Sequence, residues 1–401
     1  MLEQVRMSSD NRLLEAVSEL WEIGGNEAVS ARQVSANASV PVSSIYHHFG
    51  SLEQLSVLAQ EQAQTGARNW GRERLDQLAG LSAGPDAFAA FFAATVDDWV
   101  IGQRRLAFAW REGQMLRIDG EAGVQMRLGW HKLWAAFWQE ACSRFGLADR
   151  AWIAERLFEN ESFVHMIDWR RTVDRAGLDE FARGASAWLT GGAMPPFPWR
   201  DFAHGEALRA APDEPNHDGT TSRLAAAAAA LIEEAGPSAV THRAVAERAE
   251  LTLGVVSHKL RTKAELLQAG FEAVYVGAVA RLKERTSAIA PSNPDATLDG
   301  LADFMSQASR GHGVHALHLA VARDPALSPF GLQLRYLRGT TSRSLLATLR
   351  PDRPAPSHLE AALLSSFLSS LPRLHADDAP ADVRRRIRQA IDGMISLLPS
   401  S

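Results

Sequence analysis

The sequence predicts an all-α protein built from two related halves, and three observations lead to this prediction. Residues 12–55 align without a gap on residues 223–266, which lie 211 positions later. Apolar side chains elsewhere recur at spacings of three and four, while the alternating β-branched runs typical of strands are missing. Proline and glycine cluster between residues 191 and 218, which indicates a linker between two helical halves.

The repeat consists of one structural unit present twice, once at the head of each half. Identical residues include the pairs Arg12 and Arg223, and His47 and His258, and conservative pairs fill the positions between them. A repeat of this length indicates two copies of the same supersecondary structure. We refer to residues 12–55 as the first copy and to residues 223–266 as the second copy.

Composition limits the class of protein. A length of 401 residues exceeds what one hydrophobic core usually serves, so more than one domain is expected. The net charge of −5 does not favour general attraction to nucleic acid, which leaves any such binding to a local patch. Cys142 is the only cysteine, which excludes an internal disulfide and fits a reducing compartment. No targeting segment and no apolar stretch of about 20 residues is present, so we expect a soluble cytoplasmic protein without a membrane partner.

The first copy predicts three helices in order. Residues 11–24 form an amphipathic pattern that stops at Gly24 and Gly25. Ser30 is a suitable N-cap for a short helix over residues 31–38. After a turn at residues 39–40, Pro41 suits the start of a third helix over residues 42–48, and a long fourth helix begins at Leu52. Two short helices joined by a tight turn and supported by a preceding helix predict a helix-turn-helix.

The last helix of this motif is the one that enters the major groove of DNA. It presents small donors and acceptors of the kind that reach phosphates and base edges, namely Ser43, Ser44, Tyr46, His47 and His48. Leu13, Val17, Leu20 and Val34 are predicted to form the core beneath it.

The run SIYHHFGS-x-E-x-L, which follows a short helix opening with S-x-R, resembles the N-terminal domain of the tetracycline-repressor (TetR/AcrR) family of transcriptional regulators. The resemblance covers about 45 residues of each half. It implies DNA contacts from Ser30, Arg32, Ser43, Ser44, Tyr46 and His48 in the first copy. In the second copy it implies contacts from Thr241, Arg243, Gly254, Val255, Ser257, Lys259 and Lys263. His47 and His258, which occupy the same position in the two copies, are interpreted as packed or phosphate-facing DNA-binding residues and not as catalytic ones.

Both copies depart from the family pattern. Ser39 and Glu250 replace the glycine usual in the turn, where a positive φ is often required. Leu52 stands where the family usually has a phosphate-binding lysine, which the second copy keeps as Lys263. The second copy lacks the aromatic residues of the reading helix, so it is the more degenerate of the two. Its positive charge nevertheless suits DNA binding better than that of the first copy.

The resemblance also implies the organisation of each half. Residues 8–55 and 221–266 would be the DNA-binding domains, and residues 56–190 and 267–401 would be helical ligand-binding and dimerisation domains, with residues 191–220 as linker. The terminal helix pairs of the halves, 151–172 with 178–189 and 357–371 with 381–397, would build a four-helix interface. One chain could pair its own halves as an intramolecular pseudo-dimer, and a homodimer of tandem chains is the competing arrangement.

The tryptophans suggest an effector site. All eleven lie between residues 21 and 199, and several fall on helices that surround the ligand pocket in the resembled family. An aromatic wall with few polar groups suits a small apolar or aromatic effector. Simple core packing is the alternative for each of them. The candidate ligand-binding residues are Trp99, Trp110, Arg111, Trp134, Trp138, His165 and Trp169.

No pattern indicates a catalytic, cofactor or metal site. The sequence has no phosphate-binding loop, no Gly-x-Ser-x-Gly and no His-Glu-x-x-His. His312, His315 and His318 are spaced by three, so the outer two point about 120° apart on a helix and do not form a ligand set. The basic run 384–386 is interpreted as a solvated helix face.

The sequence therefore predicts a DNA-binding transcriptional regulator that is not an enzyme. It would act as a ligand-responsive repressor that holds an imperfect palindromic operator in double-stranded DNA through one or both helix-turn-helix copies. The alternative is a ligand-binding or protein-interaction module whose degenerate helix-turn-helix copies no longer read DNA. The sequence leaves open the effector, the operator, and the choice between repression and activation.

Overall fold

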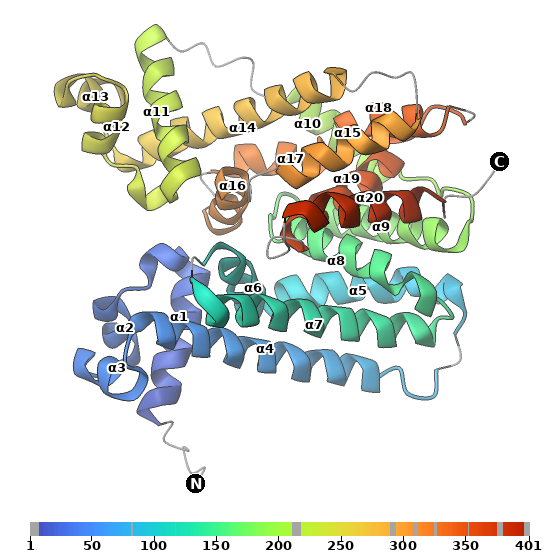
Figure 1. Ribbon diagram of the computed structural model, residues 1–401, viewed down its shortest axis with the longest axis horizontal. Coiled ribbons are helices and arrows are strands. Elements are labelled where there is room, and N and C mark those ends of the chain that lie inside the picture. Colours follow the sequence, from blue (N-terminus) through green and yellow to red (C-terminus); the bar gives the residue numbers. More distant parts are fainter. Residues whose placement is uncertain are drawn as a thin grey trace. The chain divides into compact units, whose positions relative to one another are not determined.

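A computed structural model shows that the described parts of the chain contain helices and no strand, which confirms the all-α prediction (Figure 1). The structure describes residues 8–81, 83–116, 118–210, 218–288, 294–307, 312–324, 327–351, 353–374 and 380–396. Within these ranges, no helix is long and apolar enough to cross a membrane.

Contacts divide the chain into two compact units, residues 1–158 and 159–401. The first unit contains α1 (Ser9–Gly24), η1 (Asn26–Ala28), α2 (Ala31–Ala38), α3 (Val42–Phe49), α4 (Leu52–Asp76), η2 (Pro85–Ala87), α5 (Phe88–Ile101), α6 (Arg104–Met115), α7 (Gly120–Arg144), η3 (Ala148–Arg150) and most of α8 (Ala151–His165). Its core is aromatic, and its largest fully buried side chains include Trp21, Trp99 and Trp138.

The second unit contains the end of α8 and all later helices. These are α9 (Arg171–Thr190), α10 (Pro198–Arg209), α11 (Gly219–Ala235), η4 (Pro237–Ala239), α12 (His242–Arg248), α13 (Leu253–Lys259), α14 (Lys263–Ala288), α15 (Pro294–Gln307), α16 (His312–Arg323), α17 (Ser328–Tyr336), α18 (Thr340–Leu349), α19 (His358–Leu374) and α20 (Pro380–Ser396). Helices α8 and α9, which end the first half of the sequence, thus belong partly or wholly to the unit that holds the second half.

The structure differs from the expected elements in two places. The expected linker, residues 191–220, contains α10, whose Ala203 and Ala207 are fully buried against Val173 and Tyr336. A single helix was expected over residues 151–172, but α8 ends at His165 and α9 begins at Arg171. The break is stabilised by Asp174, whose carboxylate accepts hydrogen bonds from the backbone N–H groups of residues 169 and 170 at 2.9 and 3.0 Å.

Within the second unit, helices from the two halves of the sequence pack closely. Helix α9 lies against α19, and a Cβ added at Gly184 would come within 2.9 Å of the Leu359 side chain, so the small residue permits this approach. The end of α8 also meets α19, because Arg373 donates to the Glu159 carboxylate at 2.8 Å. These are members of the two terminal helix pairs expected from the sequence.

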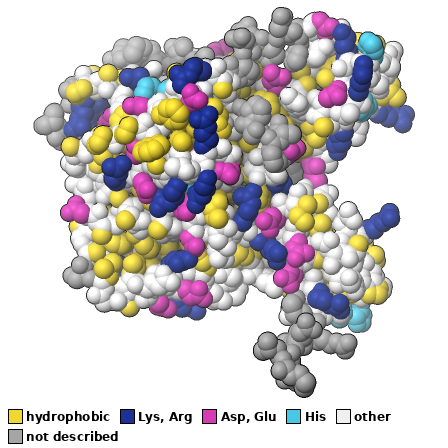
Figure 2. Space-filling model, turned by 180° about the vertical axis from the view of Figure 1, so that it is seen from behind, with side chains coloured by type: hydrophobic (Ala, Val, Ile, Leu, Met, Phe, Trp, Pro, Cys, Tyr) yellow, Lys and Arg dark blue, Asp and Glu magenta, His cyan; other side chains and the backbone are white. Residues whose placement is uncertain are grey.

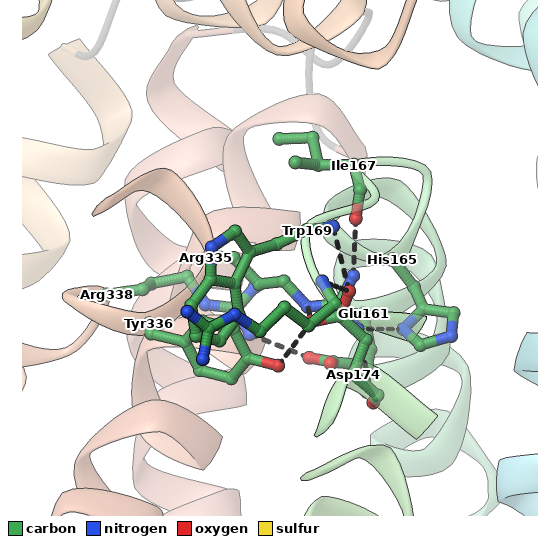
Figure 3. Close-up of polar contacts among 9 residues, drawn as sticks. Glu161, His165, Ile167, Trp169, Asp174, Arg335, Tyr336 and Arg338 are labelled. Carbon is green, nitrogen blue, oxygen red and sulfur yellow. Dashed lines mark hydrogen bonds and ion pairs between the residues drawn. The ribbon is translucent and has the colours of Figure 1, made fainter. Parts of the chain in front are cut away.

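A buried polar network joins α8 and α9 to α17 and the turn that follows it (Figure 3). Arg335 is 4% exposed and donates to the carbonyl of Ile167 and to Nδ1 of His165, and its Nε lies 3.3 Å from the Asp174 carboxylate. The Tyr336 hydroxyl donates to the same carboxylate at 2.6 Å. Burial raises the pKa of Tyr336, which keeps this hydroxyl protonated and able to donate.

A second pair in the network makes stability depend on pH. Arg338 donates to Glu161 at 2.7 Å. Burial by itself raises the pKa of Glu161, but the charges of Arg338 and Arg200 outweigh burial and lower the pKa below its ordinary value of 4.5. A carboxylate with a lowered folded-state pKa contributes stability above its unfolded pKa and loses it as the pH falls through the folded pKa.

We therefore expect Glu161→Gln to be less stable than the parent at neutral pH, with a difference that shrinks as the pH falls below 4.5. Urea midpoints of both proteins across this range would measure the difference. A difference that stays constant with pH would show that the ionised form of Glu161 does not stabilise the fold.

Candidate nucleic-acid interface

The first copy folds as a helix-turn-helix whose caps are set by its own sequence. The Ser30 hydroxyl accepts a hydrogen bond from the Gln33 N–H at 3.2 Å and starts α2. Helix α3 follows Pro41, and Val34 of α2 and Ile45 of α3 are fully buried beneath the motif. The polar face of α3 is thereby left outward.

The second copy has the same order of elements with equivalent caps. The Thr241 hydroxyl accepts from the Ala244 N–H at 3.1 Å and starts α12, and Thr252 caps α13. Val245 and Val256 are fully buried at the positions of Val34 and Ile45. The arginine in the first helix of each copy makes an equivalent contact. Arg12 donates to the carbonyl of residue 38, and Arg223 donates to that of residue 249.

The turn has the left-handed backbone expected from the family resemblance, without the glycine. Ser39 and Glu250 have φ values of 51° and 53°, and they are the non-glycine residues with positive φ in the described chain. Each is followed by a residue whose N–H bonds back across the end of the helix, Val40 to Ser35 and Leu251 to Ala246. A side chain in this conformation costs roughly 1–2 kcal/mol relative to glycine.

We expect Glu250→Gly to stabilise the second unit by about 0.5–1 kcal/mol, because relief of the left-handed strain exceeds the added flexibility of the unfolded chain. Chemical denaturation would measure the free energy of unfolding. Glu247→Gly, three positions earlier in α12, is the control and should destabilise. A loss of stability in Glu250→Gly would refute the strain argument.

Most of the side chains predicted to contact DNA are exposed. In the first copy Tyr46 is 54% exposed, and Ser44 is half-buried. In the second copy Val255 is half-buried. The exposed members of the two sets are Ser30, Arg32, Ser43, Tyr46, His47 and His48, and Thr241, Arg243, Gly254, Ser257, His258, Lys259 and Lys263.

An acidic side chain faces the end of the reading helix in each copy, which the sequence did not reveal. His48 lies 3.0 Å from Asp10 at the start of α1, and Lys259 forms an ion pair with Asp218 at the start of α11. The hydrogen bond from Lys259 lowers the pKa of Asp218 well below its usual range, so the carboxylate is ionised. In the sequence, each copy has an aspartate at the start of its first helix. Only the packing of that helix shows that the aspartate contacts the reading helix.

The two copies differ in the cations that remain for DNA. Arg243, Arg261 and Lys263 of the second copy form no side-chain ion pair within the described chain, and Figure 2 shows Lys, Arg and His side chains gathered over this part of the second unit. In the first copy only Arg32 is comparable, because Arg12 bonds to the backbone. The acidic residues of the first copy are Glu15, Glu19, Glu22, Glu27 and Glu53, and Asp10 lies just before it.

Several of those glutamates serve a contact between α1 and α6. Arg105 of α6 pairs with Glu15 at 3.3 Å and with Glu19 at 3.4 Å. The Glu112 carboxylate accepts from the Asn26 N–H at 2.9 Å, and the Glu112 carbonyl accepts from the Asn26 side chain at 3.0 Å. Helix α6 is thus attached to the helix-turn-helix of the first unit.

Five of the seven predicted ligand-binding residues meet in the first unit. Trp134 lies 4.8 Å from Trp99 and 4.9 Å from Trp110 between ring centroids, and Arg111 lies over the ring of Trp110 at 3.8 Å. Trp138 is fully buried and joins the group through Phe158, whose ring centroid lies 5.2 Å from that of Trp138 and 4.7 Å from that of Trp134. We call Trp99, Trp110, Arg111, Trp134 and Trp138 the aromatic cluster. The other two residues belong to the second unit, where His165 contacts Arg335, and Trp169 contacts Tyr336.

The aromatic cluster contains donors without acceptors. The indole N–H groups of Trp99, Trp134 and Trp138 are buried and have no hydrogen-bond partner among the described residues. By contrast, Trp130 donates to Gln60 at 2.8 Å, and Gln60 donates to the carbonyl of Ala109. The sequence pattern missed Gln60, because a glutamine on an otherwise mixed helix gives no sign of burial.

The three spaced histidines show a packing role where they are described. His315 and His318 both lie against the ring of Phe163, with centroids at 4.5 and 5.0 Å. The side chain of His312 lies outside the described residues. Among the residues that the structure does describe, no group of three or more potential metal ligands was found.

Comparison with known proteins identifies the second copy. Residues 224–270 match the family model of bacterial regulatory proteins, tetR family. No curated protein matches the chain. The matched residues comprise most of α11, then α12, α13 and the start of α14, which are the elements of the second helix-turn-helix. The match therefore supports a DNA-binding transcriptional regulator of the tetR type.

Proposed function

We propose that the chain is a tandem tetR-type regulator in which both helix-turn-helix copies face operator DNA and the second copy supplies most of the affinity. The observation that supports the proposal is that two findings fall on the same copy. The family match falls on the second copy, and the second copy holds Arg243, Arg261 and Lys263 without ion-pair partners in the part of the chain that the structure describes. Cations that displace counterions from phosphates supply a large share of the affinity of DNA-binding proteins.

The packing of the second unit supports pairing of the two halves within one chain. Helix α9 from the first half lies against α19 from the second half, and Asp174 binds Arg335 and Tyr336 across the same boundary in the sequence. A covalent pseudo-dimer would present two unlike reading helices, so its operator would be an imperfect palindrome. Light scattering after size-exclusion chromatography would report one chain for this arrangement and two for a homodimer of tandem chains.

Selection of binding sites from random double-stranded DNA at moderate salt tests the proposal. Two unlike half-sites are expected, with the second copy's half-site more strongly enriched. Arg243→Ala should weaken the half-site of the second copy, and Arg32→Ala should weaken only that of the first. If purified protein enriches no sequence, with or without candidate effectors, the DNA-reading proposal fails.

The first unit contains the elements for a response to an effector. Trp110 of α6 belongs to the aromatic cluster, and Glu112 of the same helix holds Asn26 beside α1. An apolar or aromatic molecule with hydrogen-bond acceptors would satisfy the indole donors of Trp99, Trp134 and Trp138. Its binding would release DNA only to the extent that it favours the released conformation, and repression is the mode of action proposed.

One observation favours the alternative function for the first copy. Its excess of acidic side chains around α1–α3 opposes phosphate binding, which suits a protein-interaction module. A single enriched half-site that responds to Arg243→Ala and not to Arg32→Ala would support this division of roles.

Asp218 should weaken DNA binding, because it competes with phosphate for Lys259. We expect Asp218→Asn to raise the affinity for DNA several-fold and to steepen its salt dependence by about one contact. Asparagine still caps helices well, so α11 should be retained. Fluorescence anisotropy across a salt series would measure both effects, and an unchanged slope would show that Lys259 does not reach DNA.

A further inference from the structure

The second unit contains a cavity of about 390 Å³ that the proposed function does not use. It lies where the end of α9 and the residues after it meet the end of α18 and the turn that leads into α19. Neither a helix-turn-helix residue nor a member of the aromatic cluster lines it. Its size falls in the range of small-molecule sites.

One wall of the cavity is apolar and well fixed. Trp188 and Leu346 are 5% and 3% exposed, and Pro356 is buried beside them. The backbone of Pro356 is held in place because Arg343 donates to its carbonyl at 2.7 Å. A rigid wall of this kind suits the apolar body of a ligand.

The polar lining is mainly cationic. Arg350 and Arg353 line the cavity together with Glu360. The Glu360 carboxylate already accepts from the N–H and the hydroxyl of Ser357 at 2.8 and 2.7 Å, where it caps α19. The Nε of Arg353 is buried and has no hydrogen-bond partner among the described residues. A buried donor without an acceptor is unfavourable, and an anionic group in the cavity would supply the acceptor.

We propose that this cavity binds an amphipathic carboxylate. The carboxylate would lie against Arg350 and Arg353, and the apolar body would lie against Trp188, Leu346 and Pro356. Because α9 ends the first half of the sequence while α18 and the turn belong to the second, one ligand would contact both. The site is separate from the aromatic cluster and goes beyond the proposed function, since it requires no DNA binding.

Isothermal titration of the full chain tests the proposal with two probes, octanoate and 1-naphthoate, which are a flexible and a flat carboxylate. Octanamide and inorganic phosphate are the ligand controls. At least one carboxylate should bind, and Arg353→Gln should weaken it by about tenfold or more, as expected for loss of a charge-assisted hydrogen bond. Ala355→Phe, which places a ring at the lining, should also block binding. Arg183→Gln, an exposed arginine on α9 outside the cavity, should leave binding unchanged.

Three results would overturn the proposal. The first is that neither carboxylate binds at millimolar concentration. The second is equal binding of octanamide and octanoate, or equal binding to the parent and Arg353→Gln, which would mean that the arginines serve only the nearby helix ends. The third is phosphate binding as tight as that of the carboxylates, which would mark a simple anion site. Each readout is ligand binding alone, so failure here leaves the DNA-binding proposal standing, and failure to bind DNA leaves this one standing.

Discussion

Replacing Arg243, Arg261 and Lys263 together with alanine is expected to lower the affinity for DNA by about 100-fold at 0.15 M salt. Each phosphate contact contributes about 0.9 to the slope of log affinity against log salt. At 0.15 M salt, the loss of one contact therefore lowers the base-10 logarithm of the affinity by about 0.7. The three side chains are exposed and form no ion pair in the described chain, so little stability should be lost. The slope should fall by about 3, measured by anisotropy with DNA from the selection.

A matched control removes the same charge elsewhere in the second unit. Arg384, Arg385 and Arg386 are exposed on α20, where Arg384 and Arg385 pair with aspartates. Their replacement with alanine should leave the slope within error of the parent. If both triple variants lose affinity equally, the effect is one of net charge, and the second copy has no special role. Arg32→Ala alone should reduce the slope by at most about 1.

Asp174→Ala is expected to destabilise the second unit by about 3–5 kcal/mol, the cost of removing one partner from a buried ion pair. The Asp174 carboxylate is almost completely buried, accepts from Tyr336 and from two backbone N–H groups, and pairs with Arg335. Without it, the acceptors that the described residues offer to the buried guanidinium of Arg335 are the Ile167 and residue 174 carbonyls and the His165 ring. Urea unfolding, followed by circular dichroism, would measure the loss.

Asp179→Ala provides the control on the same helix. Asp179 forms a partly exposed i,i+4 pair with Arg175, so its removal should change stability by less than about 0.5 kcal/mol. Similar small losses in both variants would show that the network of Figure 3 does not hold the second unit together. Because the chain has two units, the transition of the second should be followed separately from that of the first.

The sequence alone determined the helical fold and the local geometry of the helix-turn-helix. The first three helices and their caps lie close to the predicted bounds, because capping and amphipathic spacing act within a few residues. Ser39 and Glu250 stood out in the sequence as departures from the glycine usual in the resembled family, and both have the positive φ that this turn often requires. The family match at residues 224–270 agrees with the resemblance in the second copy.

Only the tertiary structure decided which side chains have partners within the protein and which are available to bind a ligand. Asp218 reaches Lys259 across 41 positions, and Asp174 reaches Tyr336 across 162, and no local pattern encodes such partners. Tertiary structure also decided the role of α10. The prolines and glycines of this region predicted a linker, but the alanines of α10 pack in a hydrophobic core. Local sequence determines backbone conformation through short-range hydrogen bonds and sterics. Whether a charged side chain is paired depends instead on which residues, distant in the sequence, lie beside it in the folded protein.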